Sequence, residues 1–110
     1  MKLDLSQLSY DPQWFPFDDG VELHIRPYPF SRSNVVLRDN GFLISGKDQC
    51  EIFKHCLVAW KNVVGADNNP LPCTDEVKQK IFDFRMGGIS DFVLQKNREF
   101  QDRKGGEEKN

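Results

Sequence analysis

Apolar and polar residues alternate in the first third of the chain, where frequent prolines prevent a long helix. Prolines at positions 12, 16, 27 and 29 predict an extended backbone between Tyr10 and Leu37. A turn is predicted at Asp18-Asp19-Gly20, because acidic residues and glycine favour turns. After it, the alternation in residues 21–26 predicts a half-buried strand with its apolar side chains on the inner face.

Two shorter apolar runs follow this strand. Asn34–Leu37 and Phe42–Ile44 flank a turn-like sequence at residues 39–41, which predicts two further short strands. Runs as short as these are also compatible with helix.

The apolar spacing changes after Asp48, where apolar residues recur every three or four positions up to Gly65. This period is that of an amphipathic helix, and glycine commonly ends one. The predicted stripe consists of Ile52, Phe53, Cys56, Leu57, Trp60, Val63 and Val64. Trp60 is predicted to be the central anchor of the core, with a direct contact to a partner as the alternative. The expected core neighbours of Trp60 are Phe53, Leu57, Ile81 and Phe82.

Two more helices are predicted towards the C-terminus. The first runs from Asp75 to Met86, because the Thr74 hydroxyl can cap its start and acidic residues fill its first turn. Gly87-Gly88 predicts a break, after which the second helix begins near Ser90 with a narrow apolar edge. Residues 104–110 contain little that could be buried and are predicted to be a disordered tail.

Together these segments predict an α+β fold. A short antiparallel N-terminal sheet packs against the Trp-bearing helix and a broken C-terminal helical hairpin. The chain has 110 residues, of which 38% are hydrophobic, and this fits a single domain at residues 1–103. A domain of this length can fold without disulfides or a metal.

Charge and the N-terminal sequence limit the partners and the location. The net charge is −2 and basic residues form no cluster, so nucleic acid is not expected as a partner. Residues 1–10 lack an apolar stretch long enough for export or for crossing a membrane, which predicts a cytoplasmic protein with no membrane partner. In that reducing compartment, the odd count of three cysteines favours free thiols.

The residues that could form a metal site or a catalytic pair have the wrong spacing for one. Cys50 and Cys56 lie six positions apart on the predicted helix and Cys73 is distant, so no zinc site is expected. His55 points about 100° away from Cys56 on a helix, which argues against a thiol–base pair. Residues 67–69 lack the alternating ligand pattern of a calcium loop. We therefore expect no enzyme activity, no metal and no cofactor.

Aromatic residues form the candidate binding surface. Trp14-Phe15-Pro16-Phe17 places bulky side chains so densely that they cannot all enter one small core. Part of this segment is expected to contact a protein partner, and the alternative is a lid that packs over the helices. The candidate contact residues are Trp14, Phe15, Phe17, Phe92, Val93 and Phe100.

A longer pattern in the middle of the chain resembles that of a known group of proteins. It consists of Val58-Ala59-Trp60-Lys61-Asn62-Val63-Val64-Gly65 and then Asn69-Pro70-Leu71-Pro72-Cys73-Thr74-Asp75-Glu76. This pattern is similar to that of tail assembly chaperones and related small tail proteins of long-tailed bacteriophages and prophages. Those proteins carry a Trp, a short aliphatic-Gly stretch, a Pro-Leu-Pro run and a Thr or Ser that opens a helix. The order of elements agrees loosely over residues 14–100.

The resemblance implies a non-enzymatic protein that holds another tail component, such as the tape measure protein, in the cytoplasm of the bacterial host. The chain departs from the group at Ala59, where an Asp is common, at Lys61 and Asn62, and at the double glycine, which leaves the subgroup and its partner open. One alternative is a structural tail subunit or connector that forms a homo-oligomer and stays in the virion. The other is a small enzyme or metal-dependent regulator, which no group of residues supports.

Overall fold

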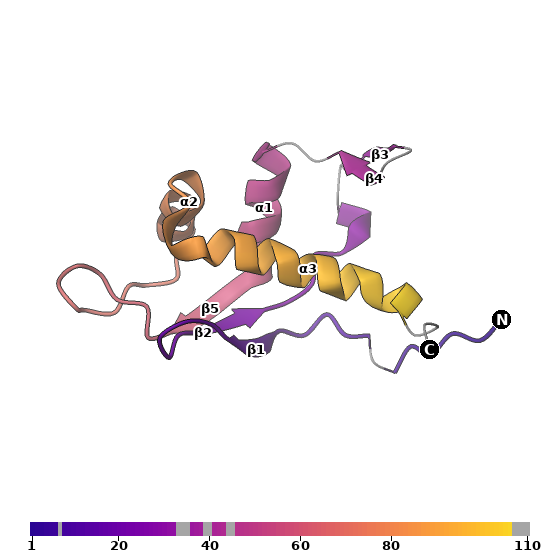
Figure 1. Cartoon of the computed structure of the whole chain (residues 1–110), viewed down its shortest axis with the longest axis horizontal. Helices are drawn as coiled ribbons and strands as arrows, with labels where there is room; N and C mark the ends of the chain where they lie inside the picture. The colour runs from indigo at the N-terminus through magenta and orange to yellow at the C-terminus, as the bar shows by residue number, and fades with distance from the viewer. Residues whose placement is uncertain (7, 33–35, 39–40, 44–45, 107–110) are drawn as a thin grey trace.

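Helices cover one face of a small antiparallel sheet (Figure 1). The computed structural model describes residues 1–110 except 7, 33–35, 39–40, 44–45 and 107–110. The described residues form a three-stranded sheet, a separate two-stranded sheet and three α-helices, which confirms the α+β class. The helices are α1 (Gly46–Cys56), α2 (Asp75–Asp83) and α3 (Ile89–Gly106). Buried apolar side chains from the larger sheet and from all three helices form one core.

The larger sheet has the strand order β1-β2-β5, with both strand pairs antiparallel. It consists of β1 (Gln13–Pro16), β2 (Glu22–Ile25) and β5 (Leu57–Lys61). β2 confirms the strand predicted for residues 21–26. The predicted turn at Asp18–Gly20 joins β1 to β2, and both residues 19 and 20 have left-handed backbone angles.

The smaller sheet consists of β3 (Val36–Arg38) and β4 (Gly41–Leu43), which pair antiparallel. These strands include the described residues of the two short strands predicted at 34–37 and 42–44. The other residues of those two predictions, and turn residues 39 and 40, lie outside the described part of the chain.

The prediction of one helix up to Val64 is wrong in its second half. α1 ends at Cys56 and β5 begins at the next residue, so Trp60 lies on a strand and not on a helix. A register shift in the β2–β5 pairing adds one residue between Leu57 and Trp60. Because of this β-bulge, both side chains face the helices although they are three positions apart, a spacing that imitates a helical stripe.

A buried lysine supports the abrupt change from α1 to β5. Lys78 lies on α2 and is only 7% exposed. Its ammonium group donates hydrogen bonds to the carbonyl oxygens of Lys54 and Leu57, both at 2.8 Å. The last carbonyl oxygens of a helix have no partner within the helix, and a cation satisfies them while also interacting favourably with the negative end of the helix dipole.

Arg26, which directly follows β2, satisfies the two carbonyl oxygens between those that Lys78 binds. Its Nε donates to the His55 oxygen at 2.9 Å and its backbone N–H donates to the Cys56 oxygen at 3.0 Å. The oxygens of residues 54–57 are therefore all hydrogen-bonded, by groups from a strand and from another helix. The junction joins β2, α1 and α2.

The C-terminal helices agree with the prediction apart from the residues at which they end. The Thr74 hydroxyl accepts a hydrogen bond from the Val77 N–H at 3.2 Å, so Thr74 is the N-cap of α2 as predicted. α2 ends at Asp83 and not at Met86, because Arg85 has a left-handed φ of 51°. A short 3₁₀ helix, η2 (Met86–Gly88), then leads into α3. α3 extends to Gly106 and so includes residues 104–106, which were predicted to belong to the tail; residues 107–110 lie outside the described residues.

The centre of the core is Phe53 and not Trp60. Phe53 on α1 is fully buried, and Leu23, Ile25 and Val93 around it are also fully buried. Trp60 is half-buried at the rim of this cluster. Its indole N–H donates to the Leu71 carbonyl at 2.8 Å, which ties β5 to the loop before α2. A buried indole commonly needs such a partner, so the rim suits Trp60 better than the apolar centre.

Replacing Lys78 with Met should lower the free energy of unfolding by about 2–4 kcal/mol, because one buried and one partly buried carbonyl oxygen lose their donor. Lys80→Met on the exposed side of the same helix is the control and should change stability by less than about 0.5 kcal/mol. Urea unfolding followed by circular dichroism measures both. Equal stability of the two variants would show that Lys78 does not support the junction.

Gly88→Ala should cost about 1–2 kcal/mol, because Gly88 has a φ of 72° and a residue with a Cβ is strained there. An added Cβ at Gly88 meets no atom within 4 Å, so the cost comes from the backbone alone. Gly46→Ala is the matched control, since Gly46 also has open space and has no positive φ. It should leave the melting temperature unchanged or raise it, and a loss as large as that of Gly88→Ala would contradict this account.

Candidate functional site

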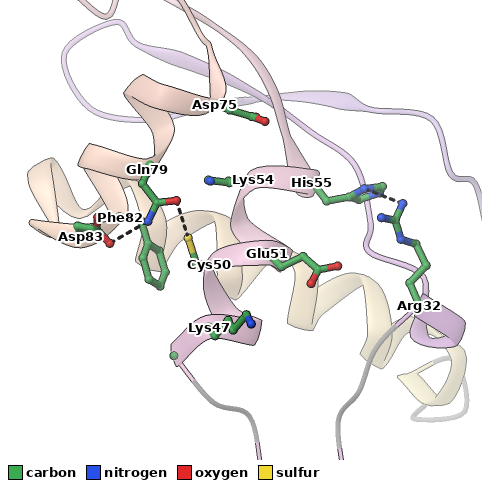
Figure 2. A pocket seen from close by; sticks show the side chains of 11 residues that line it. Arg32, Lys47, Cys50, Glu51, Lys54, His55, Asp75, Gln79, Phe82 and Asp83 are labelled. Carbon is green, nitrogen blue, oxygen red and sulfur yellow. Dashed lines mark hydrogen bonds between the residues drawn. The ribbon is translucent and has the colours of Figure 1, made fainter.

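The two helices α1 and α2 and the 3₁₀ helix η1 (Phe30–Arg32) border an open cavity of about 690 Å³. Figure 2 shows the side chains that line it. Most are polar or charged, and both signs are present. The lining residues are Arg32, Gly46, Lys47, Cys50, Glu51, Lys54, His55, Asp75, Gln79, Phe82 and Asp83.

The two most reactive groups in this cavity, a thiol and an imidazole, contact different neighbours. Cys50 Sγ lies 3.6 Å from Gln79 Oε1, whereas His55 Nδ1 lies 3.2 Å from Arg32 Nη1. Figure 2 shows the thiol and the imidazole turned towards these different partners. A thiol nucleophile needs a base within hydrogen-bond reach, and His55 is not placed to serve Cys50.

The thiols of Cys56 and Cys73 also lie in surroundings that disfavour the thiolate. Burial raises the pKa of Cys56 to about 12, and it raises the pKa of Cys73 as well. All three cysteines are free thiols. Across the described ranges, no three His, Cys, Asp or Glu side chains are close enough to hold a metal ion.

The aromatic residues of the candidate binding surface divide between the two faces of the sheet. Phe15 and Phe17 face α3, where their rings make edge contacts with Phe100 at 6.0 Å and Phe92 at 5.0 Å. These four rings are half-buried. Val93 is fully buried in the core, so its prediction as a contact residue is wrong. The inner residues of this segment therefore attach the first hairpin to α3.

Trp14 points to the opposite face of the sheet, because successive residues of a strand alternate between faces. Its indole stacks on the His24 imidazole with ring centroids 4.2 Å apart and planes within 3°. The Lys61 ammonium lies 4.4 Å from the centroid of the indole, a cation–π contact. Trp14 thus remains exposed on a surface that includes one residue from each strand of the larger sheet.

Sequence reasoning missed the most exposed apolar segment, which precedes β1. Leu3 is 72% exposed, Leu5 is 65% exposed and Tyr10 is 75% exposed, and Met1 and Leu8 are also exposed. Among the described residues of this segment, the hydrogen bonds are local, such as that from the Leu8 N–H to the Leu5 carbonyl. The sequence signal for this segment is a set of separate leucines, Leu3, Leu5 and Leu8, with no continuous apolar run around them.

A second exposed apolar site lies at the turn between α2 and α3. Phe84 is 76% exposed and Met86 is also exposed, next to Arg85 with its left-handed backbone. The Arg85 guanidinium binds both carboxylate oxygens of Asp91 at 3.2 Å. This pair holds the turn in front of α3 and leaves the Phe84 ring in water.

No family model matches the chain, and no curated protein or solved structure is significantly similar to it. Within the described residues, none of the helices combines the length and the apolar character that a bilayer crossing requires.

Phe17→Ala should lower the free energy of unfolding by about 2–3 kcal/mol, because the ring is half-buried against Phe92 and its loss leaves a gap under the first hairpin. Phe84→Ala removes the same ring from an exposed position and should cost less than about 0.5 kcal/mol. Thermal unfolding of the two variants gives the comparison. If Phe17→Ala were as stable as Phe84→Ala, the hairpin would not be docked on α3.

Proposed function

We propose that this chain is a non-enzymatic protein of bacteriophage or prophage tail assembly, which binds another tail component, such as the tape measure protein, and acts as a chaperone for it. The observation that carries the proposal is the exposed apolar segment before β1. Large apolar side chains that are exposed together mark sites of interaction with proteins. The five exposed apolar residues of this segment are Met1, Leu3, Leu5, Leu8 and Tyr10.

The energetics favour a segment that becomes buried on binding. Burying a leucine completely contributes about 1.5–3 kcal/mol, so these side chains can provide a large part of the binding free energy. Local hydrogen bonds, as from the Ser6 N–H to Asp4 Oδ1, leave the segment able to change conformation on a partner. Segments that order on binding combine moderate affinity with the ability to release their partner, which suits a chaperone.

The assignment to tail assembly rests on the resemblance at residues 58–76. Trp60 and the Pro70-Leu71-Pro72 run, which carry much of that resemblance, lie together in the fold. The Trp60 indole binds the Leu71 carbonyl, and the Leu71 N–H donates to the Val63 carbonyl at 2.9 Å. Matching residues that contact one another in the fold support the resemblance to tail assembly proteins better than scattered matching residues would.

A structural tail subunit or connector is the second candidate. The observation in its favour is that β5 lies at the edge of the larger sheet. An edge strand presents backbone groups that can pair with a strand of another chain, including a second copy. A subunit of this kind would form a closed ring or a polymer on its own, whereas a chaperone would assemble mainly with its partner.

The first experiment co-expresses the chain with the products of its neighbouring reading frames and measures the mass of each species by light scattering after size exclusion. The proposal predicts a complex with one identified tail component. A triple variant, Leu3→Ser with Leu5→Ser and Leu8→Ser, should weaken that complex at least tenfold, equivalent to about 1.4 kcal/mol.

Phe84→Ser combined with Met86→Ser is the matched control, because it removes apolar groups of similar exposure from the turn between α2 and α3. It should leave the affinity unchanged. If the complex still forms with the triple variant, the binding surface does not include these leucines. A ring formed by the chain alone would favour the structural subunit. A chain that binds none of its neighbours would contradict the tail-assembly function.

A further inference from the structure

His55 and Arg32 form a contact that depends on the protonation state of the histidine. His55 is in the last turn of α1, and its Nδ1 lies 3.2 Å from Nη1 of Arg32 on η1. A guanidinium has hydrogen-bond donors and no acceptor. The contact therefore requires an Nδ1 without a proton, which places the proton of the neutral ring on Nε2.

Tyr28 links the same two elements beside this contact. Its ring meets the His55 imidazole edge-on, with centroids 5.2 Å apart, and the Arg32 guanidinium lies 5.5 Å from its centroid. The Tyr28 hydroxyl donates to Glu51 Oε2 at 2.8 Å. Histidine, arginine, tyrosine and glutamate thus form one cluster between α1 and η1, in which Arg32 makes the contacts from η1.

The charges that face His55 oppose its protonation on balance. Partial burial lowers the pKa of His55, and so do the positive charges of Arg26 after β2, Arg32 on η1 and Lys78 on α2. Glu51, one turn earlier on α1, raises the pKa of His55, but less than burial and the two arginines lower it. A proton on His55 would bring two cations into direct contact.

We propose that the Arg32–His55 contact is a proton-sensitive latch, which holds η1 against α1 when the imidazole is neutral and releases η1 when the imidazole takes up a proton. Both residues line the cavity in Figure 2, from η1 and from α1. Release of Arg32 therefore removes one wall of the cavity and opens the side that faces η1. The latch is independent of the tail-assembly function.

The direction of the pH effect follows from the lowered pKa. The unfolded chain binds the His55 proton more readily than the folded chain. Neutral His55 therefore contributes its full stabilisation above about pH 6.5, the ordinary histidine pKa. This stabilisation decreases as the pH falls from there to the lower pKa of His55 in the folded chain. Acid thus weakens the attachment of η1.

The first test follows both histidines of the chain by NMR during a pH titration. Arg32→Gln should shift the His55 titration to higher pH, because a cation that opposes its protonation is removed. His24, which stacks on Trp14 on the outer face of the sheet, serves as an internal reference signal. Arg98→Gln, at an exposed position on α3, is the control variant and should leave His55 unchanged. An unshifted His55 titration in Arg32→Gln would overturn the proposal.

The second test measures release of η1 through the Arg32 amide, whose N–H donates to the Pro29 carbonyl at 3.0 Å. Between about pH 7.5 and about pH 5.5, its protection factor in hydrogen exchange should fall at least about threefold in the wild type. His55→Asn keeps a neutral acceptor near the position of Nδ1 and cannot be protonated, so its protection factor should stay constant. A constant value in the wild type, or the same fall in His55→Asn, would show that His55 does not control η1.

Discussion

Four consecutive carbonyl oxygens, the last three of α1 and the first of β5, have no helical partner, because the chain passes directly from α1 into β5. A buried polar group without a partner is costly, so the fold depends on supplying donors at this point. Lys78 from α2 and Arg26 from the end of β2 provide them. The same junction therefore fixes the position of α2 against α1 and the register at which the sheet meets the helices. Three elements that are distant in sequence become one unit through polar contacts, within a core that is otherwise apolar.

The alternation of side chains along β1 determines which aromatic residues of this segment remain exposed. Phe15 on β1 and Phe17 just after it pack on α3 and give up most of their apolar surface to the core, whereas Trp14 remains outside with His24 and Lys61. The exposed leucines lie further towards the N-terminus, where the chain has left the sheet. The packed sheet and helices thus carry a separate, exposed apolar segment. This division lets the sheet and helices stay folded while the segment changes its environment.

Local signals in the sequence were sufficient for part of the fold. The strand at 21–26, the Thr74 cap and the break at Gly87-Gly88 each depend on neighbouring residues, and all three are present. The end of α1 was missed because it depends on donors 21 to 30 positions away, which a periodicity cannot show. The β-bulge then gave Leu57 and Trp60 a helix-like spacing. The burial of Val93 was missed because the residues after it are mostly polar, which suggested an exposed helix.

The two tryptophans have different surroundings, so each is an intrinsic fluorescence probe of a different part of the protein. Trp60 is held at the rim of the core by its bond to Leu71, so its emission reports on whether β5 and the following loop remain assembled. Trp14 lies in contact with an imidazole and an ammonium group, both of which can quench an excited indole. A ligand that covers the outer face of the sheet alters the fluorescence of Trp14 and leaves that of Trp60 unchanged. Replacing either tryptophan with phenylalanine separates the two spectra without adding a dye.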